Sequence, residues 1–299
     1  MYLCETQPMF NDFASETVDV NGIRIRTRRG GKGPPVLLLH GHPQTLFMWH
    51  AVAARLAREF TVVAADLRGY GDSAKPPTTP DHAPYAKRAM AADQVGVMRR
   101  LGFETFFVAG HDRGGRVAYR MALDHPDCVK KLAVLDIVPT LTAFQRADAA
   151  FGLGYYHWFF LAQPYDLPER LINADPEYFW RWHTTRGPKP PEFFAPEALA
   201  DYLRCMRNPE TVHGICEDYR AAASIDLEHD RADFGRRKIA CPVLALWGRR
   251  GKLDTWYDVL AVWRDWAADV RGRSLDCGHY LAEEAPDETA AELSTFFSA

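Results

Sequence analysis

The sequence predicts an α/β fold in which a mostly parallel central sheet is flanked by helices and carries a helical insertion. Short apolar runs typical of buried strands alternate with helical patterns in the first and last parts of the chain. In between, the sequence is helical in character, rich in Trp, Tyr and Phe, and interrupted by prolines. We therefore divide the chain into residues 1–138 as the first part of the core, 139–234 as a helical cap and 235–299 as the second part of the core.

The first part of the core begins with a predicted hairpin. The stretch SETVDVNGIRIRTRRGG alternates apolar and polar residues around Asn21-Gly22, a dipeptide typical of tight hairpin turns. The elements that follow are the strand VLLL, a helix through Trp49 to Phe60, the strand TVVAAD, a helix from about Tyr85 to Leu101, the strand TFFVA with a helix after it, and the strand KLAVLD. The last of these strands ends at Asp136.

The second part of the core resumes the alternation after the insertion. We expect a strand at CPVLALWG, a helix over WYDVLAVWRDWAADV, a short strand at RGRSLD and a last helix from about Glu283 to Phe297. The insertion would therefore lie on top of an α/β core.

Composition and charge indicate a globular protein without a nucleic-acid or membrane partner. Of the 299 residues, 47% are hydrophobic and 25% are charged. The net charge of −3 argues against nucleic-acid binding, which is accompanied by a basic excess. The start, MYLCETQPMFNDF, does not resemble a secretory signal, and the apolar runs are too short to cross a bilayer. We expect a cytoplasmic protein.

The cysteines and glycines do not indicate a metal or a cofactor. The six cysteines form no CxxC pair and no metal-type spacing, so we expect reduced thiols. They are Cys4, Cys128, Cys205, Cys216, Cys241 and Cys277. The sequence also contains no P-loop and no dinucleotide-type GxGxxG. We therefore expect neither a cofactor nor a metal.

The functional prediction begins with the stretch GHDRGGR, residues 110–116. It follows the strand TFFVA and precedes the helical pattern RVAYRMALDH. A strand, a sharp glycine-flanked turn and a helix form a nucleophile elbow, which exposes its middle residue at the top of a sheet. Enzymes that hydrolyse esters place serine there, whereas this chain has Asp112. The motif therefore predicts a carboxylate nucleophile.

Two further residues at strand ends complete a predicted catalytic triad. Asp136 follows KLAVL, and His279 lies in the loop DCGHY before the last helix. Ligands of open α/β sheets bind beyond the carboxyl ends of the strands. Alone, an Asp after a strand is often a helix cap and a single His is usually structural, but with the elbow and the HG loop they indicate a triad. Asp254, after the strand VLALW, is a rival acid that we rank below Asp136.

A carboxylate nucleophile suits displacement at a saturated carbon. Asp112 would form an alkyl-enzyme ester, and His279 would then activate water to attack the ester carbonyl. Asp136 would orient the imidazole. The backbone N–H groups of His42 and Arg113 are the expected oxyanion hole. This chemistry fits either halide displacement or epoxide opening.

Arg113 and Arg116 point to an anionic substrate. Both lie in the first turn of the elbow helix, where a cation is unfavourable by a few tenths to about 1 kcal/mol. Two cations there make sense if an anion binds at the same helix end, and the guanidinium fork suits a carboxylate. An ion pair with a protein acid such as Asp66 or Glu284 is the alternative. A short carboxylic acid with a leaving group on its α-carbon would explain both arginines.

Several motifs together resemble the haloacetate dehalogenases, a family of α/β hydrolases that includes the fluoroacetate dehalogenases. They are GHDRGGR, DLRGYGDS, LDIVPT, Tyr156-His157-Trp158, CEDYRA and CGH, and the resemblance runs from about Gly33 to the C-terminus. DLRGYGDS recurs across α/β hydrolases, whereas the Asp elbow with two arginines and the aromatic cap residues is specific.

The resemblance implies an α/β-hydrolase fold with a helical cap inserted after the strand that ends at Asp136. It implies Asp112 as nucleophile, His279 as base and Asp136 as acid, with Arg113 and Arg116 binding the substrate carboxylate. It further implies that His157, Trp158 and Tyr219 donate hydrogen bonds to the halide. Relatives are commonly dimers, which makes a homodimer one expectation, but the sequence leaves the oligomeric state open.

One departure from the family and two rival functions remain open at this point. Family members commonly carry Phe where this chain has His42, so the preference for fluoride or chloride is not predicted. An epoxide hydrolase would use the same Asp-His-Asp residues with cap tyrosines, but it would leave the arginines unexplained. A catalytically silent member of the fold would be expected to lose the nucleophile or the histidine, and this chain retains both.

Overall fold

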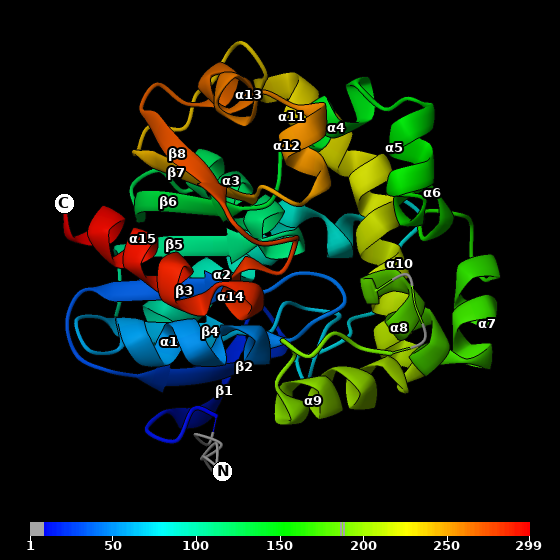
Figure 1. Cartoon of the computed structure of the whole chain (residues 1–299), viewed down its shortest axis with the longest axis horizontal. Coiled ribbons are helices and arrows are strands. Elements are labelled where there is room, and N and C mark those ends of the chain that lie inside the picture. Colours follow the sequence, from blue (N-terminus) through cyan, green and yellow to red (C-terminus); the bar gives the residue numbers. More distant parts are fainter. Residues whose placement is uncertain (1–8, 186, 188) are drawn as a thin grey trace.

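The computed structural model describes residues 9–185, 187 and 189–299 of the chain. In these residues, eight strands form one sheet in the order β1-β2-β4-β3-β5-β6-β7-β8 (Figure 1). Their bounds are β1 Ala14–Val20, β2 Ile23–Gly30, β3 Pro35–Leu39, β4 Thr61–Ala65, β5 Phe106–His111, β6 Val129–Leu135, β7 Val243–Gly248 and β8 Val270–Leu275. β2 pairs antiparallel with β1 and β4, and the pairs from β4 to β8 are parallel. The mostly parallel sheet is confirmed.

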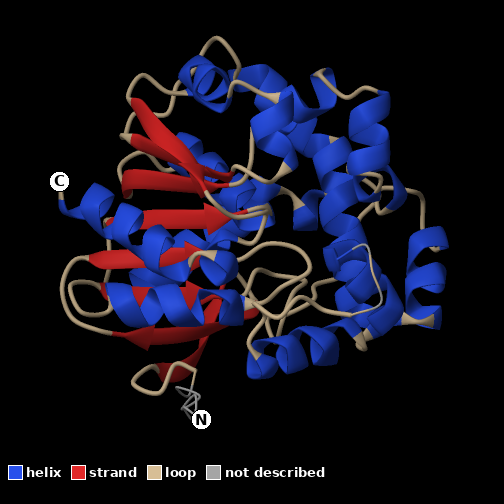
Figure 2. Ribbon diagram, viewed as in Figure 1, coloured by secondary structure: helices blue, strands red, loops and turns tan. Residues whose placement is uncertain are grey.

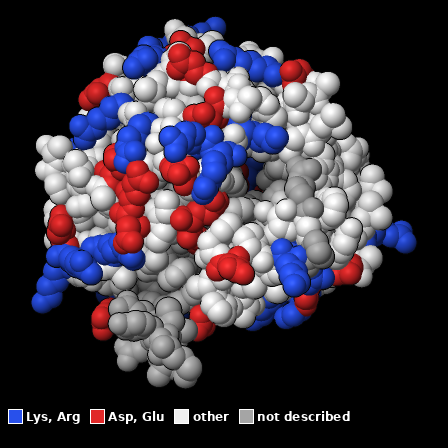
Figure 3. Space-filling view, viewed as in Figure 1, with Lys and Arg blue, Asp and Glu red and all other residues white. Residues whose placement is uncertain are grey.

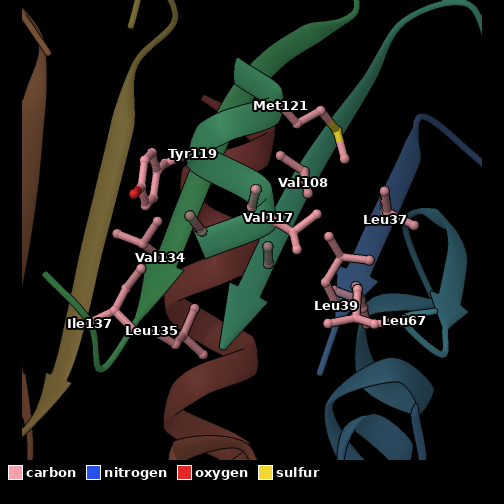
Figure 4. Packing of buried hydrophobic residues seen from close by; sticks show 14 of the residues in the cluster. Leu37, Leu39, Leu67, Val108, Val117, Tyr119, Met121, Val134, Leu135 and Ile137 are labelled. Carbon is pink, nitrogen blue, oxygen red and sulfur yellow. The ribbon is translucent and has the colours of Figure 1, made fainter. Parts of the chain in front are cut away.

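The hairpin and the buried strands form where the sequence predicts them. Asn21 and Gly22 have φ angles of 50° and 77°, as the tight turn between β1 and β2 requires. Figure 4 shows Val117 of an adjacent helix packed between Val108 of β5 and Leu39 of β3, all of which are fully buried. This continuous apolar packing holds the carboxyl ends of the strands in fixed positions relative to one another.

Helices cover both faces of the sheet (Figure 2). The core helices and short helical turns are η1 Leu46–Trp49, α1 His50–Leu56, η2 Ala83–Tyr85, α2 Lys87–Arg100, α3 Arg113–Asp124, α12 Lys252–Trp256, α13 Val259–Trp266, α14 Leu281–Glu284 and α15 Pro286–Ser298. Helices α1 and α15 lie side by side on one face, and α2 and α3 lie on the other (Figure 1). The sheet is therefore buried on both faces, as its continuous apolar strands require.

The helices between β6 and β7 gather beyond the carboxyl ends of the parallel strands (Figure 1). They are α4 Thr140–Gln145, α5 Ala149–Gly154, α6 His157–Phe160, α7 Leu167–Ala174, α8 Pro176–Thr185, α9 Pro196–Met206, α10 Pro209–Ala223 and α11 Ile225–Asp233. All eight lie within the segment 139–234, so the helical insertion after the strand ending at Asp136 is confirmed. We call these helices the cap.

Two helix predictions in the second part of the core were wrong in their bounds. The helix expected over WYDVLAVWRDWAADV is only α13, because Tyr257 is extended and the Asp258 carboxylate caps the helix by accepting the Ala261 N–H at 3.0 Å. The last helix is divided into α14 and α15 at Pro286, which has no N–H to continue a helix and starts the next one instead.

The described part of the chain contains no helix both long and apolar enough to span a membrane. Five of the cysteines, Cys128, Cys205, Cys216, Cys241 and Cys277, are free thiols. Cys4 lies outside the described residues.

Candidate active site

The elbow holds Asp112 in a strained backbone conformation between β5 and α3. Asp112 has φ 47° and ψ −115°, a region that non-glycine residues rarely adopt and that persists only where the surroundings enforce it. The turn is close to β3: a Cβ atom on Gly114 would lie 2.4 Å from the backbone oxygen of His40. Glycine at position 114 therefore lets the helix start close to the sheet, and the turn presents Asp112 at the sheet edge.

The loop after β3 supplies a hydrogen-bond donor to this carboxylate. The backbone N–H of His42 donates to Asp112 Oδ1 at 2.9 Å. This contact requires glycine at position 41, because a Cβ there would lie 2.5 Å from the Cβ of Asp112. The structure thus places the His42 amide where the sequence predicted an oxyanion-hole donor. The second predicted donor, the Arg113 amide, makes no hydrogen bond to the carboxylate within the described residues.

The ends of β6 and β8 bring Asp136 and His279 together. His279 Nδ1 lies 2.6 Å from Asp136 Oδ2, and the other carboxylate oxygen accepts the N–H of Gly248 at 2.9 Å. Since an ionised carboxylate only accepts hydrogen bonds, Nδ1 carries the ring proton and Nε2 is left as an acceptor. The rival acid Asp254 instead accepts the indole N–H of Trp247 at 2.6 Å. Asp136 is therefore the acid that contacts the histidine.

The charges of the site stabilise an ionised Asp112 and a basic His279. Burial favours the neutral acid, but His279 and Arg113 outweigh it and lower the pKa of Asp112. Burial by itself would lower the pKa of His279, yet the hydrogen bond and charge of Asp136, with the charge of Asp112, raise it. The arrangement therefore combines a carboxylate that stays ionised with a histidine that accepts a proton readily.

Arg113 is tied to the cap by a buried ion pair. Its Nε and Nη2 donate to the two carboxylate oxygens of Asp218 in α10, at 2.9 and 2.8 Å. Asp218 also accepts the Tyr70 hydroxyl at 2.6 Å and a hydrogen bond from Lys87. The guanidinium is fully buried, and within the described residues only its Nη1 lacks a partner. Most of the hydrogen-bonding capacity of Arg113 is therefore used inside the protein.

Arg116 forms no ion pair with any described residue. Its Nη1 donates to the Val138 carbonyl at 2.9 Å and to the Thr140 hydroxyl at 3.2 Å, and its Nε has no described partner. The guanidinium lies over the Trp158 ring, 4.4 Å from the centroid. Burial and the charge of Arg113 lower the pKa of Arg116. A buried guanidinium without a direct ion pair keeps hydrogen-bonding capacity that a bound anion could use.

The sequence left open that the arginines form an ion pair with a protein acid such as Asp66 or Glu284. Arg113 does form such an ion pair, but the acid is Asp218. Asp66 accepts the Leu46 amide at 2.8 Å, and Glu284 accepts the Gly278 amide at 2.6 Å, so both are engaged elsewhere. Asp218 was contained in the quoted motif CEDYRA, but no local pattern connects it with an arginine 105 positions earlier. This partner could not be found from spacing.

A cavity of about 360 Å³ lies between the sheet edge and the cap. It is lined from the core by Asp112, His279 and Arg116, and from the cap by His157, Trp158 and Tyr219. Arg113 is not among the described residues that line it. On the face shown in Figure 3, Lys and Arg side chains gather beside a hollow. Arg250 and Lys252 belong to the lining of the cavity.

A group of three histidines forms part of the cavity wall. The ring of His183, from α8, lies 4.7 Å from the ring of His42 and 4.5 Å from the ring of His157, measured between centroids. His42 and His157 are stacked at 6.5 Å. Sequence reasoning did not single out His183, because nothing in its local pattern distinguishes it from other histidines of the cap.

Residues 34–286 match the family described as alpha/beta hydrolase fold. The chain belongs to this family. Among curated α/β-hydrolase relatives, a fluoroacetate dehalogenase from a Burkholderia species is 48% identical over 97% of this chain and 95% of its own. A soluble epoxide hydrolase from Corynebacterium sp. (strain C12) is 35% identical over 93% of this chain and 95% of its own.

Solved structures agree with this assignment. The crystal structure of ALR0039 from Nostoc sp PCC 7120 has a TM-score of 0.94 and 55% identity, and the match covers 97% of this chain and 99% of that chain. The resemblance to haloacetate dehalogenases seen in the motifs is confirmed by the 48% identity to the Burkholderia fluoroacetate dehalogenase.

The contact between Asp136 and His279 predicts how substitution changes the titration of the histidine. Replacing Asp136 by Asn removes the negatively charged carboxylate that contributes most to raising the pKa of His279, so the pKa of His279 falls relative to the wild type. The pH titration of the His279 ring in NMR spectra measures this. Asp254→Asn is the matched control and should leave the titration unchanged. An equal shift in both variants would contradict the assignment of Asp136.

Proposed function

We propose that this α/β hydrolase removes halide from short 2-haloacids, converting haloacetates, including fluoroacetate, to glycolate and halide. The observation that carries the proposal is that one cavity holds both an ionised elbow carboxylate, Asp112, and the buried Arg116, which forms no direct ion pair with any described acid. A substrate that is both an anion and an alkylating agent satisfies both groups. The 48% identity to a fluoroacetate dehalogenase supports the same reaction class.

The first step is displacement at the α-carbon. Asp112 Oδ1 is engaged by the His42 amide, which leaves Oδ2 as the attacking oxygen. A new bond forms between Oδ2 and the α-carbon while the carbon–halogen bond breaks, and the halide leaves with the electron pair. Arg116 would hold the substrate carboxylate, and His157, Trp158 and Tyr219 would donate hydrogen bonds to the halide. Arg113, which does not line the cavity, would contribute its positive charge.

The second step is hydrolysis of the Asp112 ester. Water loses a proton to His279 Nε2 and attacks the ester carbonyl carbon, and the negative charge that develops on Oδ1 is stabilised by the His42 amide. The intermediate then expels the glycolate oxygen, which takes the proton from His279, and the Asp112 carboxyl group loses the remaining proton of the water to solvent and is again a carboxylate. Formation of the ester removes the Asp112 charge that raises the pKa of His279, so the histidine is more readily neutral when it must act as a base.

Epoxide hydrolysis is the second candidate, because Tyr155 and Tyr219 also line the cavity and could protonate an epoxide oxygen. The Corynebacterium relative supports this reading. An uncharged epoxide, however, would leave the unused hydrogen-bonding capacity of Arg116 without an anion to bind. A substrate carboxylate would use that capacity, which favours the haloacid.

The two candidates are separated by their products. We expect ion chromatography to detect halide released from fluoroacetate, chloroacetate or bromoacetate, and no comparable diol formation from styrene oxide. His279→Asn should convert substrate once and accumulate an ester on Asp112, which mass spectrometry of the intact protein detects; Asp112→Asn should form none. Diol formation without halide release would overturn the proposal in favour of the epoxide hydrolase.

Replacing Arg116 by Gln should raise the KM for chloroacetate by about 10- to 100-fold, because a charge-assisted hydrogen-bonded contact to the carboxylate is lost. Steady-state halide release measures this change. Arg250→Gln is the matched control, since Arg250 also lines the cavity but its side chain is 63% exposed and lies near acidic residues. An unchanged KM in Arg116→Gln would show that this arginine is structural.

A further inference from the structure

The side chain of His42 lies beside the nucleophile with unsatisfied hydrogen-bonding groups. His42 is 1% exposed, and neither Nδ1 nor Nε2 has a hydrogen-bond partner within the described residues. Buried polar groups in folded proteins are almost always hydrogen bonded, so such an imidazole indicates a missing partner. Because His42 lines the cavity, a molecule bound there can supply that partner.

The position of the ring indicates which part of the ligand it faces. The His42 ring is 5.6 Å from the Tyr219 ring and 6.5 Å from the His157 ring, measured between centroids. These two side chains are halide donors in the proposed function. His42 therefore borders the place where the leaving group would lie, and its backbone N–H on the other side holds Asp112.

The imidazole is neutral at ordinary pH. Burial lowers the pKa of His42 well below its usual value, and the neighbouring His183 lowers it further. A neutral imidazole has one N–H donor and one acceptor nitrogen. The His42 ring packs against the rings of His183 and Tyr219 at steep interplanar angles of 65° and 81°, and this packing holds the imidazole in place before the substrate binds.

We propose that the His42 side chain donates a hydrogen bond to the departing halide and thereby accelerates the release of fluoride more than the release of chloride. This inference rests on the proposed function and adds a residue that determines its leaving-group preference.

The chemistry of the halides gives the direction of the effect. When the Asp112 oxygen bonds to the α-carbon, the electron pair of the carbon–halogen bond passes to the halogen. Fluoride is small and concentrates this charge, so it depends more on fixed donors than chloride, whose charge is spread over a larger ion. A phenylalanine, which the family commonly has here, would fill the same space without a donor.

The experiment isolates the step that breaks the carbon–halogen bond. In protein carrying His279→Asn, which should stop after ester formation, halide release is measured in a single turnover with fluoroacetate and with chloroacetate. Adding His42→Phe should slow fluoride release by about 10- to 100-fold, as expected for loss of a hydrogen bond to a charged group, and chloride release clearly less. The ratio of the two rates is the readout, because a general packing defect would lower both.

Two further variants restore a donor without the ring. His42→Asn and His42→Gln place an amide N–H near the positions of Nδ1 and Nε2, and at least one of them should recover part of the fluoride rate. If the ester still forms and His42→Phe slows the release of fluoride and chloride equally, or slows neither, the inference is overturned. Failure of the His279→Asn protein itself to form an ester with either substrate would overturn the proposed function instead.

Discussion

The site depends on keeping the Asp112 carboxylate ionised where it is almost completely buried. Burial of an anion is costly unless hydrogen bonds and positive charges offset it. In this chain the offset comes from three sources: the His42 amide, the His279–Asp136 pair and the two arginines of the elbow helix. Each source lies at the carboxyl end of a strand or the start of a helix, so the sheet itself fixes the distances between them.

The two arginines lie in the same turn of the elbow helix, separated by two glycines, but differ in their surroundings. Arg113 is held by Asp218 in a network that also includes Lys87 and Tyr70 and joins the core to cap helix α10. Arg116 has no such acid and lines the cavity. The first arginine therefore anchors the cap and supplies a fixed charge, whereas the second retains the capacity to bind an anion. Because Tyr219 follows Asp218 in the same helix, the anchor also fixes the position of Tyr219 in the cavity wall.

The sequence was informative where function depends on local backbone geometry. The apolar runs located the strands. The glycine-flanked Asp112 identified the elbow because few sequences can adopt the backbone conformation of such a tight turn. Asp136 was preferred over Asp254 from its place at a strand end, and the contact with His279 agrees. The roles of these residues in catalysis remain proposals.

Contacts made only by tertiary folding could not be predicted. Asp218, from a helix distant in sequence, accepts a hydrogen bond from Arg113. The ring of His183 contacts the ring of His42 because α8 packs over the sheet edge. The start of α13 was missed because the Trp-rich run begins before the N-cap residue Asp258, although Pro286 could have indicated the break before α15.

Attack of a side-chain oxygen of Asp112 on the α-carbon can be tested by tracing where oxygen from water is incorporated during the reaction. The wild-type protein is given less than one equivalent of chloroacetate in water enriched in oxygen-18, and glycolate and peptides are analysed by mass spectrometry. We expect unlabelled hydroxyl oxygen in the glycolate of this first turnover and one heavy oxygen in the peptide that contains Asp112. Labelled glycolate with an unlabelled Asp112 peptide would show that water attacks the substrate directly and that Asp112 is not the nucleophile.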